Sequence, residues 1–477
     1  MNNLDEPPPA CRAANRVTDF RGTLGVLLLL TLWAGLVRAQ DTTAKPAMSG
    51  TSPAVGLSSI SRPPQHTPNL CPFLLNLPLD HLLGDWDGFR PKLENTGLTT
   101  TLTYVNDIAG NVTGGKDQGM AYSENIGLNM LFDLQKLVGL DGGTVLISMS
   151  QRNGSSLSTT HVGNTFTIQQ NFGGETFKLI DVAWQQKLLD DRVELRVGRL
   201  ATGDDFLVST YDYLFMQNAF DGNPVGIFFN SPGMTAYPNA TWGALVKIKP
   251  TERTYIMGGI YNGDASIRAN TYNGVNLSMN GPLFAIGEVC YQANGLPGDG
   301  PLLGHYKAGF WYDNSIYTNY RSPAAGKPEN NRGNWGFYGL FDQLLVSFGE
   351  PGDDRGFGIF GSVMASPNQS ISRLPYFFTA GFACFGPFAS RPADVAGFGL
   401  VYGDFSSDLR QEQEQETELD PAIGVQNYET DLEWTYRISL RNGAVFFQPD
   451  IQYVIRPGGT GNIEDALVLG CQIGVNF

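Results

Sequence analysis

The sequence predicts an all-β protein, a transmembrane antiparallel β-barrel of about 16 strands with a short N-terminal periplasmic helical segment. Only 16% of the 477 residues are charged, whereas 12% are aromatic and 58 residues are glycine. The mean hydropathy is still near neutral, at -0.15, and the interior of the chain offers no run of about 20 apolar residues for a membrane-spanning helix. Many stretches instead alternate between apolar and polar residues with a period of two, which indicates strands.

The charge balance and the cysteine content exclude several other classes. The net charge is -15, whereas a protein that binds nucleic acid needs a basic stripe. The same charge argues against a surface built to collect anionic ligands. The five cysteines form no CxxC pair and the four histidines are scattered. We therefore expect no metal, no cofactor and no disulfide framework.

The N-terminal region begins with an export signal and a linker. An apolar stretch from Leu24 to Val37 follows basic residues and precedes a small-x-small cleavage pattern. This order predicts a signal peptide over residues 1–39, the alternative being a short buried helix. Residues 40–70 are rich in Thr, Ser and Pro and show no periodicity, which indicates a flexible linker.

A compact segment separates this linker from the barrel. Residues 71–97 are expected to form a short helical pre-barrel segment, with Asp85 or Asp87 as its N-cap and Gly97 just past its end. Residues 98–477 are then expected to form a single barrel domain, because they contain no second domain and no internal repeat.

The strand pattern extends over most of these residues. Alternating runs of five to eleven residues are separated by turn signals such as Leu189-Asp190-Asp191. They include Ile126–Phe132, Thr144–Gln151, Phe177–Gln186, Arg192–Leu200, Ala244–Ile248, Tyr255–Tyr261, Leu283–Tyr291, Tyr306–Tyr312, Trp335–Leu344, Phe357–Met364 and Val445–Ile455. A soluble β-sandwich would alternate too, but this much strand exceeds one sandwich core. A barrel with its apolar face toward lipid leaves no exposed edge.

The final strand gives the most specific indication of location. Its alternate residues form an unbroken apolar face: Leu467, Leu469, Cys471, Ile473, Val475 and Phe477. A terminal aromatic that closes an alternating strand resembles the assembly signal of bacterial outer-membrane proteins. We therefore expect an outer-membrane protein of a Gram-negative-type bacterium, whose partners are outer-membrane lipid and, through Phe477, the barrel assembly machinery. The sequence leaves open whether the barrels associate into a homo-oligomer.

An ordered set of motifs also resembles the carbohydrate-selective porins of the OprB type. The resemblance runs from about Leu82 to Phe477. Its motifs are Leu83–Arg90, Leu195–Leu200, Gly287–Tyr291, Tyr306–Tyr312, Gln448–Tyr453 and Pro457–Gly459, with Asp87 standing where the family more often has glycine. The resemblance implies a 16-stranded channel that passes neutral mono- and oligosaccharides down their concentration gradient. A porin for another small solute is the alternative.

Candidate pore-lining residues follow from parity, because lumen side chains alternate with lipid-facing ones. Sugars need donors and acceptors for paired hydroxyls and an aromatic face under the ring. The inward positions that supply these groups are Asp181, Glu194, Arg196, Glu288, Lys307, Trp311, Gln448, Asp450 and Gln452. The alternative is that they are lumen side chains engaged in cross-strand ion pairs.

Arg199 needs a separate explanation, because it has the parity of the lipid face. Either it lies at the membrane interface, or Gly198 marks a bulge that turns it inward. We include it among the pore-lining residues. His161 and His305 are the only barrel histidines, and no GxSxG or HExxH motif is present, so we expect no catalytic residue and no enzyme activity.

Overall fold

The computed structural model describes residues 81–477, apart from residues 221, 269–274, 297–298, 301, 322–328, 350–354 and 420–423. The predicted signal peptide (residues 1–39) and linker (residues 40–70) lie outside the described residues. So do residues 71–80 of the expected pre-barrel segment.

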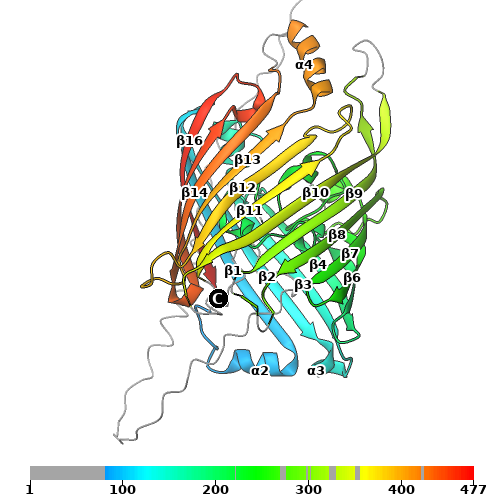
Figure 1. Ribbon diagram of the computed structural model, residues 1–477, viewed down its shortest axis with the longest axis vertical. Helices are drawn as coiled ribbons and strands as arrows, with labels where there is room; N and C mark the ends of the chain where they lie inside the picture. The colour runs from blue at the N-terminus through cyan, green and yellow to red at the C-terminus, as the bar shows by residue number, and fades with distance from the viewer. Residues whose placement is uncertain are drawn as a thin grey trace, which may run out of the picture. The chain divides into compact units, whose positions relative to one another are not determined.

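Sixteen antiparallel strands form a closed barrel in which β1 pairs with β16, which confirms the predicted fold class and strand number (Figure 1). The first half contains β1 Leu98–Gly115, β2 Gly119–Asp133, β3 Gly143–Gly154, β4 Thr176–Leu188, β5 Val193–Leu200, β6 Thr241–Thr251, β7 Thr254–Asn262 and β8 Leu283–Ala293. The second half contains β9 Gly304–Thr318, β10 Asn330–Ser347, β11 Gly356–Ala365, β12 Tyr376–Phe385, β13 Val395–Asp404, β14 Tyr428–Leu440, β15 Val445–Ile455 and β16 Glu464–Asn476.

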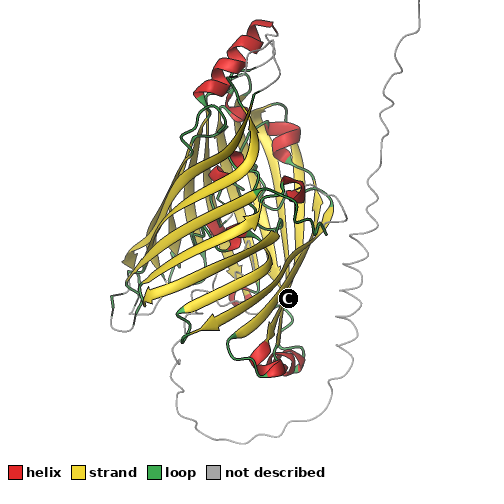
Figure 2. Ribbon diagram, turned by 90° about the vertical axis from the view of Figure 1, so that its right-hand side faces the viewer, coloured by secondary structure: helices red, strands yellow, loops and turns green. Residues whose placement is uncertain are grey.

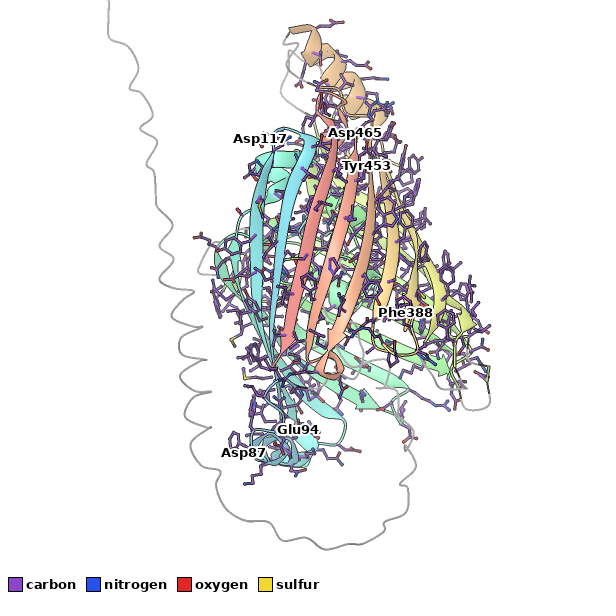
Figure 3. All side chains as sticks on the ribbon, turned by 90° about the vertical axis from the view of Figure 1, so that its left-hand side faces the viewer. Asp87, Glu94, Asp117, Phe388, Tyr453 and Asp465 are labelled. Carbon is purple, nitrogen blue, oxygen red and sulfur yellow. The ribbon has the colours of Figure 1, made fainter. Side chains whose placement is uncertain are left out.

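The two ends of the barrel differ in their connections. At the end that holds α2 (Phe89–Thr96) and α3 (Leu134–Val138), several connections are tight turns, such as the one between β6 and β7. The opposite end carries longer loops and α4 (Ser407–Leu419) (Figures 1 and 3). In bacterial barrels the short turns face the periplasm, so the α4 end is the outer one. No helix within the described residues is long and apolar enough to cross a membrane.

The pre-barrel segment begins its helix differently from the prediction. Neither Asp85 nor Asp87 caps α2: its N-cap is Gly88, and no side chain bonds to that end. The reason lies in the backbone, because Asp87 and Gly88 both have positive φ and carry the chain through a left-handed turn. Gly97, with φ 101°, ends the helix as expected.

This segment packs against the end of the last strand. Arg90 is buried, and its Nη2 donates to the carbonyl of Phe477 over 2.7 Å. The backbone N–H of Leu82 donates to Asn476 over 2.8 Å. The segment therefore lies beside the β1–β16 seam.

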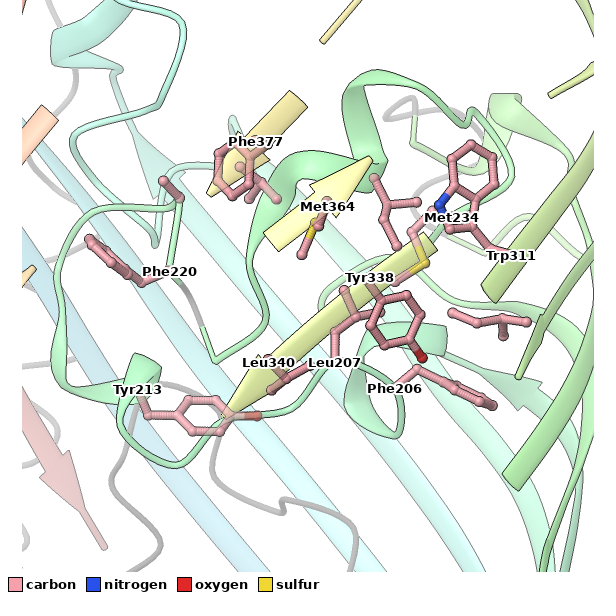
Figure 4. Packing of buried hydrophobic residues seen from close by; sticks show 14 of the residues in the cluster. Phe206, Leu207, Tyr213, Phe220, Met234, Trp311, Tyr338, Leu340, Met364 and Phe377 are labelled. Atoms are coloured by element: carbon pink, nitrogen blue, oxygen red, sulfur yellow. The ribbon is translucent and has the colours of Figure 1, made fainter. Parts of the chain in front are cut away.

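The main hydrophobic core lies inside the barrel. Residues 201–240, which connect β5 to β6, contribute rings such as Phe206, Phe215 and Phe220, all fully buried. They pack against inward side chains of the wall that include Tyr338 and Phe377 (Figure 4). The lumen is therefore partly filled by the protein itself.

Candidate functional site: the narrowed lumen

Two connections enter the lumen and join there. Residues 155–175 link β3 to β4 and contain η2 (Ser158–Val162), whereas residues 201–240 contain η3 (Thr202–Asp204), η4 (Asp212–Leu214) and η5 (Val225–Phe229). Gln170 N–H donates to Met216 over 2.8 Å and Asn218 N–H donates to Thr167 over 2.9 Å. Short helical turns are visible inside the ring of strands (Figure 2). We call these two connections the inner loops.

Carboxylates on the barrel wall hold the inner loops by their backbone. Glu433 on β14 accepts the N–H groups of Met216, over 2.6 Å, and Gln217, over 3.1 Å. Glu429 lies four residues before Glu433 on the same face of β14. It accepts the N–H groups of Thr165, over 2.7 Å, and Phe166, over 2.9 Å. Hydrogen bonds to an ionised acceptor are stronger than neutral ones. One strand thus fixes both inner loops.

Another part of the wall, strand β9, binds the 201–240 loop in the same way. Asp313 on β9 accepts the N–H of Gly233 over 2.8 Å and the hydroxyl of Ser231 over 2.6 Å. Donors on the wall complete the set: the Arg437 guanidinium donates to the carbonyl of Tyr213 over 3.1 Å, and the Gln448 amide donates to Leu214 over 2.6 Å.

Glu194 and Arg196, two predicted residues, form an ion-paired group with a loop residue. Arg196 Nη2 lies 2.9 Å from Glu194 Oε1, and its Nη1 lies 2.7 Å from Asp205 Oδ1. All three side chains are nearly buried. These ion pairs differ from the cross-strand alternative, because Glu194 and Arg196 lie on the same strand, β5, and Asp205 comes from the inner loop.

The predicted residues Glu288, Lys307 and Trp311 also meet the 201–240 loop. Glu288 accepts the N–H of Leu207 over 2.9 Å, and Lys307 Nζ donates to the carbonyl of Val208. Trp311 is fully buried and belongs to the hydrophobic core. Its ring therefore offers no face to a solute in this structure.

The remaining inward residues are buried too. Asp181 accepts the hydroxyl of Ser148 and the N–H of Ala201. Gln452 donates to Asp450 over 2.9 Å and to the carbonyl of Ile168 over 3.2 Å. The contacts with Ala201 and Ile168 join the wall to the inner loops, whereas those with Ser148 and Asp450 lie within the wall.

Arg199 points inward despite its parity. Val197 is 49% exposed, whereas Arg199 is 2% exposed. The pairing on both sides of β5 keeps its register, so no residue is inserted; Gly198 turns the chain with a φ of 144°. The Arg199 guanidinium donates to the carbonyls of Leu179, over 3.0 Å, and Asn276.

Arg199 is part of a basic cluster that the sequence reasoning missed. The charges of Arg152 on β3 and of Arg199 both act on Lys178 of β4. Arg152 lies 5.3 Å from the Tyr237 ring centroid, and Lys178 Nζ donates to Asn239 over 2.8 Å. Arg152 directly follows the predicted strand Thr144–Gln151 and has the same parity as Thr144. Extending that strand by one residue would therefore have placed Arg152 on the inward face.

The inward face of β14 was missed as well. Glu429, Asp431, Glu433 and Arg437 alternate with outward Leu432 and other apolar residues. This clean period of two was readable from the sequence. Across the described residues, no group of three or more His, Cys, Asp or Glu side chains could hold a metal ion.

Comparisons with known proteins agree with this architecture. The family model "Carbohydrate-selective porin, OprB family" matches residues 117–477. Porin B of Pseudomonas aeruginosa is 25% identical over 423 residues, which cover 83% of this chain and 91% of that protein. The high-pH structure of Pseudomonas putida OprB superposes with a TM-score of 0.77 at 24% identity, covering 84% of this chain and 99% of that chain.

The low-pH structure of the same Pseudomonas putida protein gives a TM-score of 0.55 at 19% identity, covering 84% of this chain and 100% of that chain. These two likenesses concern the fold. The family match covers most of the chain, and it places the protein among channels of the outer membrane rather than among enzymes. The chain belongs to the OprB family of carbohydrate-selective porins.

Proposed function

We propose that neutral mono- and oligosaccharides diffuse passively through this lumen into the periplasm, in preference to ions. The observation that carries the proposal is that charged wall groups are already engaged within the protein. Glu194, Arg196 and Asp205 form ion pairs, and Glu429, Glu433 and Asp313 accept N–H groups of the inner loops. A paired charge attracts a passing ion weakly. Sugar hydroxyls, by contrast, exchange hydrogen bonds readily with the carbonyls and amides of a narrow polar passage.

We propose two roles for the inward residues. Arg199, with Arg152 and Lys178, forms the basic group that contacts the solute. The other residues position the inner loops: Asp181, Glu194, Arg196, Glu288, Lys307, Trp311, Gln448, Asp450 and Gln452. Contacts such as those of Glu288 with Leu207 and of Gln452 with Ile168 support the positioning role. The contact role of the first group rests on its charge, because its three side chains are buried as well.

Liposome swelling with glucose, maltose and maltotriose tests the proposal. We expect swelling that slows as the sugar lengthens, and we expect Arg199→Gln to slow glucose uptake by roughly three- to tenfold, the value of one lost hydrogen-bonding group. Arg192→Gln is the matched control, because Arg192 lies in the exposed turn before β5. The proposal is wrong if no sugar swells liposomes that contain the wild-type protein.

A small anionic solute is the second candidate, and the basic cluster of Arg152, Lys178 and Arg199 favours it. The reversal potential in a salt gradient separates the two. A strongly anion-selective current, with gluconate passing faster than glucose, would support the anionic solute.

We also propose that residues 1–39 direct export, and that the assembly machinery reads the apolar face of β16 together with Phe477, which directly follows that strand. The alternation of β16 and its position at the seam with β1 support the second point. Phe477→Ala should lower the amount of assembled barrel in the outer membrane, whereas Phe382→Ala, which changes another outward ring, should not.

A further inference from the structure

A polar cavity lies among the loops of the outer end, and Lys178 of the basic cluster reaches the backbone carbonyl of Arg268, one of its lining residues. Its volume is about 340 Å³, large enough for one sugar ring. It opens between η5, the end of β9 and the loop that follows β11, and its walls include Phe228, Phe229, Tyr320, Arg268 and Arg373.

The aromatic walls of this cavity are only partly covered. Phe228, Phe229 and Tyr320 pack against the hydrophobic core and remain partly exposed. Rings that keep an accessible face beside polar groups are suited to the apolar C–H face of a sugar. Packing against the hydrophobic core does not by itself explain why these three rings also line a cavity.

Arg373 supplies free donors at the same place. Its guanidinium lies 5.7 Å from the centroid of Phe405, and within the described part of the chain it makes no hydrogen bond or ion pair. Arg268, the other arginine of the cavity, is already engaged, because its Nη2 donates to the carbonyl of Ser231 over 2.7 Å. One guanidinium fork is therefore available to a ligand.

The back of the cavity is held rigidly. The Asn230 side chain donates to the carbonyl of Leu374 over 2.6 Å and accepts its N–H over 2.9 Å. Asn334 donates to the Asn230 carbonyl over 3.0 Å. These bonds join the 201–240 loop to the loop after β11, so the cavity is formed before any ligand arrives.

We propose that this cavity is an outer subsite that binds one pyranose ring of a neutral sugar before it enters the lumen. The ring stacks on Tyr320 and the two phenylalanines, and Arg373 donates to two adjacent hydroxyls. The charges of Arg373 and of Glu412 on α4 act on Tyr320 in opposite directions, so the surroundings are not purely basic. The inference rests on the proposed sugar transport and adds a capture step to it.

The test is the glucose concentration that half-reduces the ion current through the full chain in planar bilayers. We expect Arg373→Gln and Tyr320→Ala each to raise it by roughly three- to tenfold, the loss of one hydrogen-bonding or stacking group. Swelling at glucose far above this concentration should stay near the wild-type rate, because the basic cluster is unchanged. Arg321→Gln is the matched control, since Arg321 pairs with Asp408 over 2.6 Å and does not line the cavity.

The outcomes separate the two proposals. If the glucose concentration that half-reduces the current is the same in both variants as in the wild type, and swelling is normal, the subsite is wrong and the proposed sugar transport is unaffected. A shift for gluconate but not for glucose overturns the neutral sugar as its ligand. Absence of any glucose effect on the wild-type current and swelling removes the proposed transport itself. Heat-dependent gel mobility verifies that each variant forms a closed barrel.

Discussion

Glu429, Glu433 and Asp313 lie on inward faces of the barrel, and each accepts backbone N–H groups from an inner loop. A buried carboxylate costs free energy unless its oxygens are hydrogen-bonded. The same bonds satisfy loop N–H groups that have no strand partner. Each of these carboxylates therefore needs the loop N–H groups as hydrogen-bond donors, and the loop N–H groups need the carboxylate as their acceptor.

Glu433→Ala removes the acceptor of two loop N–H groups and should favour displacement of the 201–240 loop by about 1–3 kcal/mol. We expect a larger and noisier open-channel current in planar bilayers. Glu414→Gln, on the exposed surface of α4, should leave the current unchanged. An unaltered current in Glu433→Ala would show that packing alone holds the loop.

A second prediction concerns Asp394, in the periplasmic turn between β12 and β13. Burial by itself would raise its pKa, but hydrogen bonds from Arg391, the Ser439 N–H and Tyr436 outweigh burial and hold the pKa below its ordinary value. A lowered folded-state pKa stabilises the barrel above the unfolded pKa, and this contribution is lost as the pH falls through the folded value. Asp394→Asn should therefore show a smaller drop in unfolding temperature between pH 6 and pH 3 than the wild type. This pH range is chosen because it brackets the ordinary carboxyl pKa of about 4. An equal drop in both proteins would contradict it.

At the scale of elements, the strands obey a period of two except where the backbone changes it. Val197 and Arg199 share one parity and yet differ in face, because Gly198 between them has a positive φ. A Cβ at this glycine would lie 2.3 Å from the Val182 carbonyl oxygen. Glycine is thus required for Arg199 to reach the lumen.

Gly198→Ala should lower the free energy of unfolding by about 1–3 kcal/mol and reduce glucose swelling, because Arg199 is displaced. Gly258→Ala is the matched control, since a Cβ there meets nothing within 4 Å. Denaturant titration of the purified barrel measures the first effect. Equal stability of the two variants would contradict the explanation.

The sequence predicts a strand well where its two faces differ in polarity. It predicts a strand poorly where both faces are apolar. The alternation in β4 and β5 marked their hairpin correctly within two residues. β12 lacks this contrast, because Phe377 and Ala383 on its inner face are as apolar as Phe378 on its outer face. The reason is tertiary: these inner residues pack against the 201–240 loop, and no local pattern shows that a loop fills the lumen.

At the scale of the whole molecule, the barrel has an apolar exterior and a second apolar core inside. Phe215 and Phe220 belong to this core, with ring centroids 4.4 Å apart. Membership of the family accounts for the barrel. The match to the family model starts at residue 117, so the motif at Leu83–Arg90 lies outside the matched residues. The packing of Arg90 against the end of β16 explains that motif by structure instead.

Phe215→Ala should destabilise the inner loop by about 3–5 kcal/mol, the cost of a large cavity, while the barrel wall remains closed. We expect higher ion conductance and weaker discrimination between glucose and maltotriose in liposome swelling. Phe382→Ala, which removes an outward ring, should keep both values. Unchanged discrimination in Phe215→Ala would show that the loop does not limit solute size.

The contacts between wall and inner loops also bear on how such channels diversify. The wall carboxylates accept N–H groups, which every residue except proline possesses. Substitution of a loop side chain therefore leaves these contacts in place, and the loop follows the same path. Side chains that face the passage are free to change in size and charge, so one barrel can supply many selectivities through variation in a short stretch of chain.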